Sequence, residues 1–180
     1  DVLALSGHSK GALTAIRQIS EMKVDVPMLA MTHCDASKLA KQHGKKSEYA
    51  LCAAQWHKSL SYKDKYFGNG MKYDKDFNAE YGYTPPYQAA ESSAALLVWK
   101  DAFERANSTD TEKVRDALAK TDMQTFYGNI KFGSGGQNTA KPMVLFQVRC
   151  EGDTCENKVV APTKWASAKL VHPIPKWSER

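Results

Sequence analysis

The sequence lacks any long hydrophobic run. No stretch of about 18 apolar residues occurs, which excludes a transmembrane helix from these residues. The first residues, DVLALSGHSKG, have neither a charged region nor a long apolar region, so we expect a strand there and not a signal peptide. Internal repeats and low-complexity stretches are also missing. With 42% hydrophobic and 25% charged residues, the composition is that of a globular protein.

Concentrated positive charge is missing as well. The net charge is only +5, and the lysines are scattered along the chain. A nucleic-acid-binding protein usually gathers its basic residues on one face or carries a recognisable module, and neither is present. We therefore expect a solvated surface and no nucleic-acid partner.

The four cysteines include no CxxC pair. Cys150 and Cys155 flank the turn-forming sequence EGDT, which predicts a disulfide that closes a hairpin in an oxidising compartment. A metal site needs more ligands, and no histidine lies near these cysteines, so we expect no metal and no cofactor. Cys34 and Cys52 are expected to be small, partly buried thiols, and their pairing stays open.

The first third of the chain alternates strands and helices. Apolar runs predict strands over 2–5, 26–31 and 49–55, with helices over 11–22 and 36–43 between them. The first helix follows from apolar residues at helical spacing, namely Ala12, Ala15, Ile16, Ile19 and Met22. This order predicts a parallel α/β sheet.

The remainder is helical and then strand-rich. Helices are predicted over 72–81 and 87–106, separated by a break at Gly82–Pro86. Thr109 and Glu112 have the spacing of a capping box for the next helix. Alternating or apolar runs then predict strands over three segments, which are 128–132, 143–148 and 159–160.

One short motif suggests an enzyme. Gly7-His8-Ser9-Lys10-Gly11 matches G-x-S-x-G between a predicted strand and a predicted helix, as in the nucleophile elbow of an α/β-hydrolase. That fold carries several strands before the elbow, whereas this chain has one. The available histidine, His172, lies in a proline-bounded tail. A serine esterase that uses Ser9 is therefore the alternative hypothesis.

A longer succession of motifs carries more information. YTPPYQAA at 83–90 leads into an alanine-rich helix, followed by VRDAL at 114–118, TFYGNIKF at 125–132, GQN at 136–138, KP at 141–142 and QV at 147–148. This order resembles the C-terminal half of the branched-chain amino-acid-binding proteins in the type I periplasmic solute-binding family. The strands and helix of the first third, and AAQW at 53–56, match the family's order too.

The resemblance implies an α/β fold of two Rossmann-like lobes with three crossover strands, the type I periplasmic-binding-protein fold, with only the C-terminal half present. Residues 1–54 would belong to lobe 2, residues 56–126 to the helical part of lobe 1, and residues 128–180 to return strands and a tail. The missing N-terminal half of the same protein would be a partner. Without it, the apolar helix faces would lack a sheet, and these faces comprise Tyr73, Phe77, Ala90, Ala94, Leu97 and Val98.

The function that the resemblance implies is ligand capture and not catalysis. Such a protein holds a small polar solute (an amino acid or a related carboxylate or amide) between two lobes and presents it to an ABC permease in the membrane from the periplasm. A signalling receptor domain with the same fold is the third hypothesis. The metal-free cleft would need only convergent polar groups and an aromatic wall.

Candidate ligand contacts follow from the strand ends, because ligands of open α/β sheets lie beyond the carboxyl ends of the strands. In amino-acid-binding members of the family, an aromatic occupies the region of His8 and an acid near Thr32 binds the ligand ammonium; this sequence departs at both. We therefore expect a ligand other than an ordinary aliphatic amino acid. The candidate residues are Ser6, His8, Thr32, His33, Asp35, Gln55, Trp56 and Tyr87. Capping or loop roles for the histidines, and packing roles for Trp56 and Tyr87, stay open.

Overall fold

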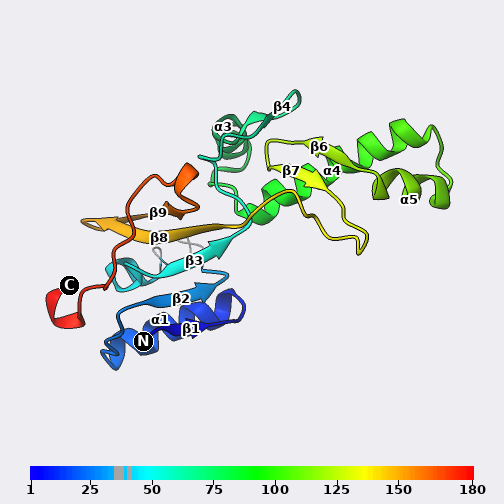
Figure 1. Cartoon of the computed structure of the whole chain (residues 1–180). Coiled ribbons are helices and arrows are strands. Elements are labelled where there is room, and N and C mark those ends of the chain that lie inside the picture. Colours follow the sequence, from blue (N-terminus) through cyan, green and yellow to red (C-terminus); the bar gives the residue numbers. More distant parts are fainter. Residues whose placement is uncertain (35–38, 40–41) are drawn as a thin grey trace. The chain divides into compact units, whose positions relative to one another are not determined.

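The computed structural model describes residues 1–34, 39 and 42–180, and its contacts divide the chain into two compact units (Figure 1). Unit 1 comprises residues 1–54 and 144–180, and unit 2 comprises residues 55–143. Residues 128–143, which were expected among the return strands, have their contacts in unit 2. Asp35 and most of the helix expected over 36–43 lie outside the described residues.

Unit 1 is built on one mixed five-stranded sheet with the order β1-β2-β3-β8-β9. The first three strands are parallel, and β8 and β9 continue the sheet antiparallel. The predicted parallel α/β pattern is therefore confirmed. The strand bounds are β1 Leu3–Leu5, β2 Leu29–Thr32, β3 Leu51–Ala54, β8 Val144–Glu151 and β9 Thr154–Ala161.

Helix α1 (Ser9–Glu21) connects β1 to β2. Its buried residues are Ala12, Ile16 and Ile19, as the spacing predicts, because these positions share one face of a helix. Met22 follows the helix as its C-cap and is 74% exposed, so the prediction that it faces inward is wrong. The described residues of unit 1 also form three short 3-10 segments: η1 Gly44–Ser47, η2 Thr163–Trp165 and η3 Trp177–Glu179.

Two disulfides cross-link unit 1. Cys150 and Cys155 face each other across the β8–β9 hairpin with Cα atoms 4.0 Å apart, which confirms the predicted disulfide. Cys34 and Cys52, whose pairing the sequence leaves open, are also joined, with Cα atoms 5.6 Å apart. Parallel pairing of Met31 with Cys52 brings these two cysteines together across 18 residues of sequence.

Unit 2 is mainly helical. Among its described strands it holds only two antiparallel pairs, β4 with β5 and β6 with β7, and no parallel sheet. The helix α5 begins after Asp110, whose carboxylate accepts a hydrogen bond from the Lys113 N–H; the cap predicted at Thr109 is therefore wrong by one residue. The elements are β4 Lys63–Asp64, β5 Gly68–Asn69, α3 Gly70–Tyr81, α4 Tyr87–Ala106, α5 Thr111–Ala119, β6 Asp122–Gln124 and β7 Asn129–Lys131.

Four aromatic residues form the core of unit 2, and we call Trp56, Phe67, Tyr73 and Phe126 the aromatic cluster. Tyr73 stacks on Phe126 with ring centroids 4.3 Å apart, and Trp56 meets both rings edge-on. Phe67 lies 5.1 Å from Phe126. The Asp64 carboxylate accepts hydrogen bonds from the N–H groups of Phe67 and Phe126, and thus ties the β4–β5 hairpin to the cluster.

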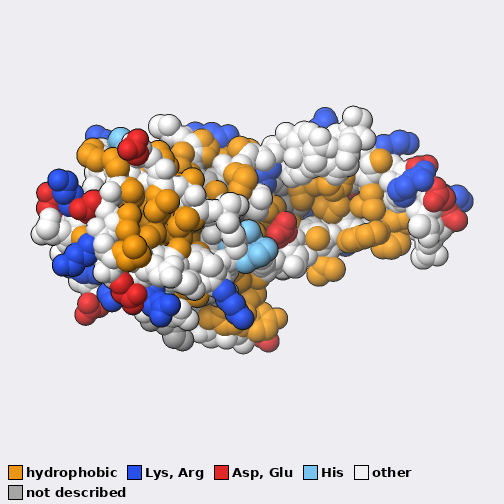
Figure 2. Space-filling view, turned by 90° about the horizontal axis from the view of Figure 1, so that it is seen from below, with side chains coloured by type: hydrophobic (Ala, Val, Ile, Leu, Met, Phe, Trp, Pro, Cys, Tyr) orange, Lys and Arg blue, Asp and Glu red, His pale blue; other side chains and the backbone are white. Residues whose placement is uncertain are grey.

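Helix α4 has the bounds that the sequence predicts, and its predicted inner residues are buried: Ala90, Ala94, Leu97, Val98 and Ala102. As expected, the described strands of unit 2 give these helix faces no parallel sheet, yet unit 2 buries Tyr73 and these α4 residues itself. A different side of α4 is bare, where Leu96, Trp99 and Phe103 are 69%, 47% and 42% exposed. Figure 2 shows hydrophobic side chains exposed on unit 2, at the right of the view.

Candidate functional site

The carboxyl ends of β1 and β2 lie side by side in unit 1. Leu5 pairs with Met31 in parallel register, so the segments that follow, Ser6–His8 and Thr32–His33, leave the sheet at the same edge. This is the place where parallel α/β sheets bind ligands. Four of the sequence-predicted residues are therefore brought together here.

The Thr32 hydroxyl joins the two segments. Its Oγ1 accepts a hydrogen bond from the Gly7 N–H and donates one to the Gly7 carbonyl, each 2.9 Å long. The only hydroxyl hydrogen is thus used within the protein. Thr32, which was predicted as a ligand contact, fastens the loops that carry the other candidates.

His33 has a fixed ring orientation. Its Nδ1 lies 2.8 Å from the Gly7 carbonyl, which accepts only, so Nδ1 carries the hydrogen. The backbone of His33 is left-handed (φ 54°), an uncommon conformation for a side-chain-bearing residue that turns the ring back over Gly7. The His8 ring lies 5.1 Å from the His33 ring, and we call these two side chains the histidine pair.

A disulfide anchors the residue next to His33. Cys34 is covalently bound to Cys52 on β3. His8 is the N-cap residue of α1, yet its side chain makes no capping hydrogen bond. Ser6 is exposed. Asp35 lies outside the described residues, and its role stays a prediction.

The other predicted contacts belong to unit 2. Gln55 and Trp56 directly follow β3, and Trp56 is only 5% exposed. Its indole N–H donates to the Phe126 carbonyl at 3.4 Å, and its ring packs in the aromatic cluster. This burial supports the packing role that the sequence leaves open for Trp56.

Tyr87 begins α4 and is half-buried. Burial, and then the negative charge of Glu91 one turn later, raise the pKa of the Tyr87 phenol. Burial, Glu91 and Tyr87, in that order, strongly raise the pKa of Tyr127, which is 7% exposed. The structure therefore adds Glu91 and Tyr127 to the surroundings of Tyr87. In the sequence, the four-residue spacing of Tyr87 and Glu91 indicates that these two side chains lie close together on the helix, and no such spacing links Tyr127 to them.

Lys141 is the other group that sequence reasoning missed. Its ammonium donates a hydrogen bond to the Gln55 carbonyl and lies 4.4 Å from the centroid of the Tyr127 ring. Burial lowers the pKa of Lys141 to about 8, and Glu91 acts in the opposite direction. Fifty residues separate Glu91 from Lys141, so no local pattern predicts their proximity.

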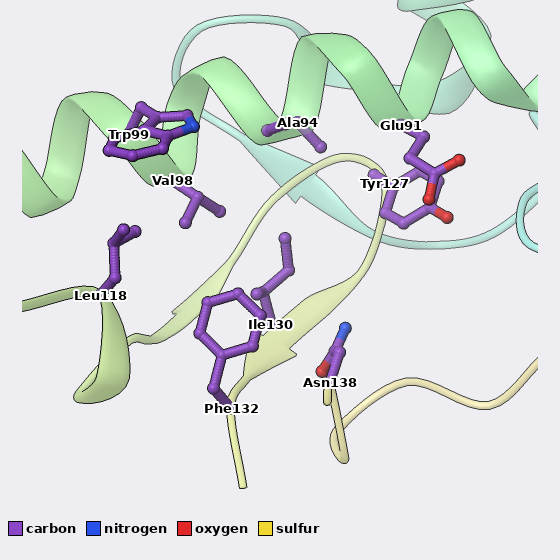
Figure 3. Close-up of a pocket in the computed structure, with 10 residues that line it drawn as sticks. Glu91, Ala94, Val98, Trp99, Leu118, Tyr127, Ile130, Phe132 and Asn138 are labelled. Atoms are coloured by element: carbon purple, nitrogen blue, oxygen red, sulfur yellow. The ribbon is translucent and has the colours of Figure 1, made fainter. Parts of the chain in front are cut away.

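Unit 2 also contains a cavity of about 340 Å³ beside α4 (Figure 3). The polar lining groups Glu91, Tyr127 and Asn138 lie toward one end, while Trp99 and Leu118 lie toward the other. The remaining lining residues are Ala94, Ala95, Val98, Ile130 and Phe132. Apart from the three polar groups at one end, the lining is mostly apolar and offers a small polar solute few hydrogen-bond partners.

Neither a metal site nor a membrane span appears in the described part of the chain. No three histidine, cysteine, aspartate or glutamate side chains there are grouped as metal ligands. Over the same residues, no helix is both long and apolar enough to cross a bilayer.

The chain is similar to known proteins over most of its length. A family model described as periplasmic binding protein matches residues 1–154. A leucine-binding protein from Thermotoga maritima superimposes with a TM-score of 0.71 at 21% identity, covering 91% of this chain and 45% of that chain.

Two further solved structures contain a bound amino acid. A branched-chain amino acid transporter substrate-binding protein from Streptococcus pneumoniae, in complex with isoleucine, gives a TM-score of 0.70 at 16% identity, covering 90% of this chain and 45% of that one. An ABC transporter substrate-binding protein from Desulfitobacterium hafniense, in complex with leucine, gives 0.62 at 16% identity, covering 87% and 43%. The chain thus spans less than half the length of these relatives, and it has the fold of about half of a type I binding protein.

Proposed function

The chain belongs to the periplasmic binding protein family, and from this premise we propose that it forms part of the solute receptor of an ABC importer. Its ligand would be a small polar solute, an amino acid or a related carboxylate or amide. The observation that carries the proposal is the histidine pair at the joined carboxyl ends of β1 and β2. Hinge closure of two lobes over the ligand would create the form that the permease recognises.

The chemistry of the histidine pair supports a carboxylate or amide ligand. With Nδ1–H of His33 engaged by Gly7, its Nε2 accepts a hydrogen bond when the ring is neutral and donates one when the ring is protonated. The neutral form suits an amide N–H, and the protonated form suits a carboxylate. His8 adds a second imidazole within reach of the same group.

The two disulfides support a location outside the cytoplasm. Structural disulfides persist in oxidising compartments such as the periplasm. We therefore propose a periplasmic receptor, with the permease and the rest of the protein as its partners.

The hydrolase alternative has little support in the geometry. A nucleophile elbow holds its serine on a strained strand-to-helix turn. Ser9 is instead the first residue of α1, and it is not among the described non-glycine residues with positive φ. The strand before it, β1, lies at an edge of the sheet.

A thermal-shift panel on the full-length protein tests the proposal. We expect L-glutamine, L-glutamate, benzoate, 4-methylpentanoate or benzamide to raise the melting temperature, since a ligand at 100 times its Kd stabilises the native state by about 2.7 kcal/mol. His8→Ala and His33→Ala should reduce the shift. His172→Ala, which alters an exposed histidine, is the matched control and should not. A flat panel, or ester hydrolysis that Ser9→Ala abolishes, would contradict the proposal.

The departure from an amino-acid site has its own test. We propose that the ligand is not an ordinary aliphatic amino acid held through a dedicated carboxylate. Micromolar or tighter leucine binding by the full-length protein, abolished by Asp35→Ala, would contradict this, and isothermal titration calorimetry measures it.

A further inference from the structure

The segment just after β3 is held by a lysine from a distant part of the chain. Lys141 donates to the Gln55 carbonyl, and the next residue, Trp56, donates its indole N–H to the Phe126 carbonyl. Lys141 also covers the ring of Tyr127, the neighbour of Phe126. Three segments of unit 2, at 55–56, 126–127 and 141, are thus connected through polar contacts at the point where the chain passes out of unit 1.

We propose that Lys141 is a positioning residue of the binding site: its ammonium fixes the backbone of Gln55 and, through it, the Gln55–Trp56 segment. The part of this inference that concerns ligand binding rests on the proposed function, because Gln55 is one of the candidate contacts. The fixing of the segment itself does not depend on a ligand.

The chain makes room for this lysine at Gly128. A Cβ atom there would overlap with Cδ of Lys141 and would lie 2.8 Å from its Cε. Gly128 also has φ +151°, a backbone conformation that favours glycine. The lysine stem therefore runs closely along residue 128 to reach Gln55, and a side chain at this position would displace it.

The charge of Lys141 is not explained by stability. Its surroundings lower the pKa to about 8 from the ordinary 10.5, which means that the folded protein disfavours the charged form. Near pH 7 the half-buried ammonium is thus a cost to folding. What the charge strengthens is the hydrogen bond to the Gln55 carbonyl, which holds that carbonyl in place.

Three described residues contribute the groups that interact with the ammonium. Glu91 on α4 contributes a negative charge, Tyr127 contributes its ring, and Gln55 contributes a carbonyl. Because the pKa of Tyr127 is raised by burial, its phenol keeps its proton between pH 7 and 9.5. Over this pH range Lys141 is therefore the group whose protonation changes at this contact. Loss of its proton weakens the hydrogen bond to the Gln55 carbonyl.

Nuclear magnetic resonance of the Trp56 indole N–H in the full-length protein tests the proposal. We expect this signal to shift with a midpoint near pH 8 in the wild type. In Lys141→Met the signal should start from a different position and show no such titration. In Lys141→Arg it should keep the wild-type low-pH position up to pH 9.5, because a guanidinium stays protonated.

Lys131→Met provides the control, since Lys131 is an exposed lysine of unit 2 paired with Asp122. This variant should titrate as the wild type does. A wild-type signal that does not move between pH 7 and 9.5, or one that moves equally in Lys141→Met, would overturn the proposal. Should Lys141→Met fail to fold, the wild type and Lys141→Arg decide alone. No ligand enters the measurement, so a flat thermal-shift panel would remove the proposed function and leave this test intact.

Discussion

The two units are stabilised in different ways. Unit 1 has a continuous five-stranded sheet, and each of its disulfides joins neighbouring strands or the segment that follows one. Unit 2 has no disulfide among its described residues and depends on the aromatic cluster and on helix packing. It also leaves one side of α4 bare. Unit 1 is thus stabilised by backbone pairing and covalent links between strands, whereas unit 2 is stabilised mainly by side-chain packing and has exposed apolar side chains on α4.

The largest expected effect comes from removing the centre of the aromatic cluster. Phe126 is fully buried and touches Trp56, Phe67 and Tyr73, so Phe126→Ala should cost about 3–5 kcal/mol. Amide hydrogen exchange should accelerate throughout unit 2 and stay slow in the sheet of unit 1. Phe103→Ala, on the bare side of α4, is the matched control and should change exchange little. Equal acceleration in both units would show that they are not separately stabilised.

A smaller effect is expected from the disulfide at the candidate site. Removing Cys34–Cys52 by the double substitution Cys34→Ala/Cys52→Ala frees a loop with a sequence separation of 18, which should cost about 3 kcal/mol. Urea unfolding followed by circular dichroism measures this loss, and exchange should now accelerate in unit 1. The double alanine variant at Cys150 and Cys155 should lose less, because its sequence separation is only 5. The reverse order would contradict the loop-entropy explanation.

The smallest expected effect is a pH-dependent change in the free energy of unfolding that comes from Lys141. Because the folded-state pKa is about 8 and the ordinary value is 10.5, the unfolded chain binds more protons between these pH values. The free energy of unfolding of the wild type should therefore rise relative to Lys141→Met as the pH increases from about 8 to 10.5. After allowance for solvent screening we expect about 1 kcal/mol. Urea titrations at pH 7.5 and 10.5 measure the difference, and a fall with pH would contradict the lowered pKa.

Local sequence patterns predicted the elements that local physics determines. Helix α4 has the predicted bounds because Pro86 precedes its first turn and Asn107 ends it in a left-handed conformation. The β4–β5 hairpin was missed because its two-residue strands are held by Asp64, whose partner Phe126 is 62 residues away. The cap of α5 was misplaced because Asp110 is as good a cap as Thr109, and the spacing alone did not distinguish them.

The candidate site could be predicted only in outline. The alternation of strands and helices identified the edge of the sheet where Ser6, His8, Thr32 and His33 lie. The individual roles could not be predicted, because the Thr32 hydroxyl is engaged by a backbone group 25 residues away. The surroundings of Lys141 were missed for the same reason, since Gln55, Glu91 and Tyr127 meet it only through folding.

The pairing of β3 with β8 gives the architecture a modular character. Ala54 and Val144, the residues on either side of unit 2, are direct partners in that antiparallel ladder. Unit 2 is thus an insertion at the end of a potential hairpin, and a two-residue turn would be enough to close β3 onto β8 in its place. Whole-unit replacement, shortening or grafting at this position would leave every backbone hydrogen bond of the remaining sheet intact. Replacement of unit 2 would therefore require only two splice points, one after Ala54 and one before Val144.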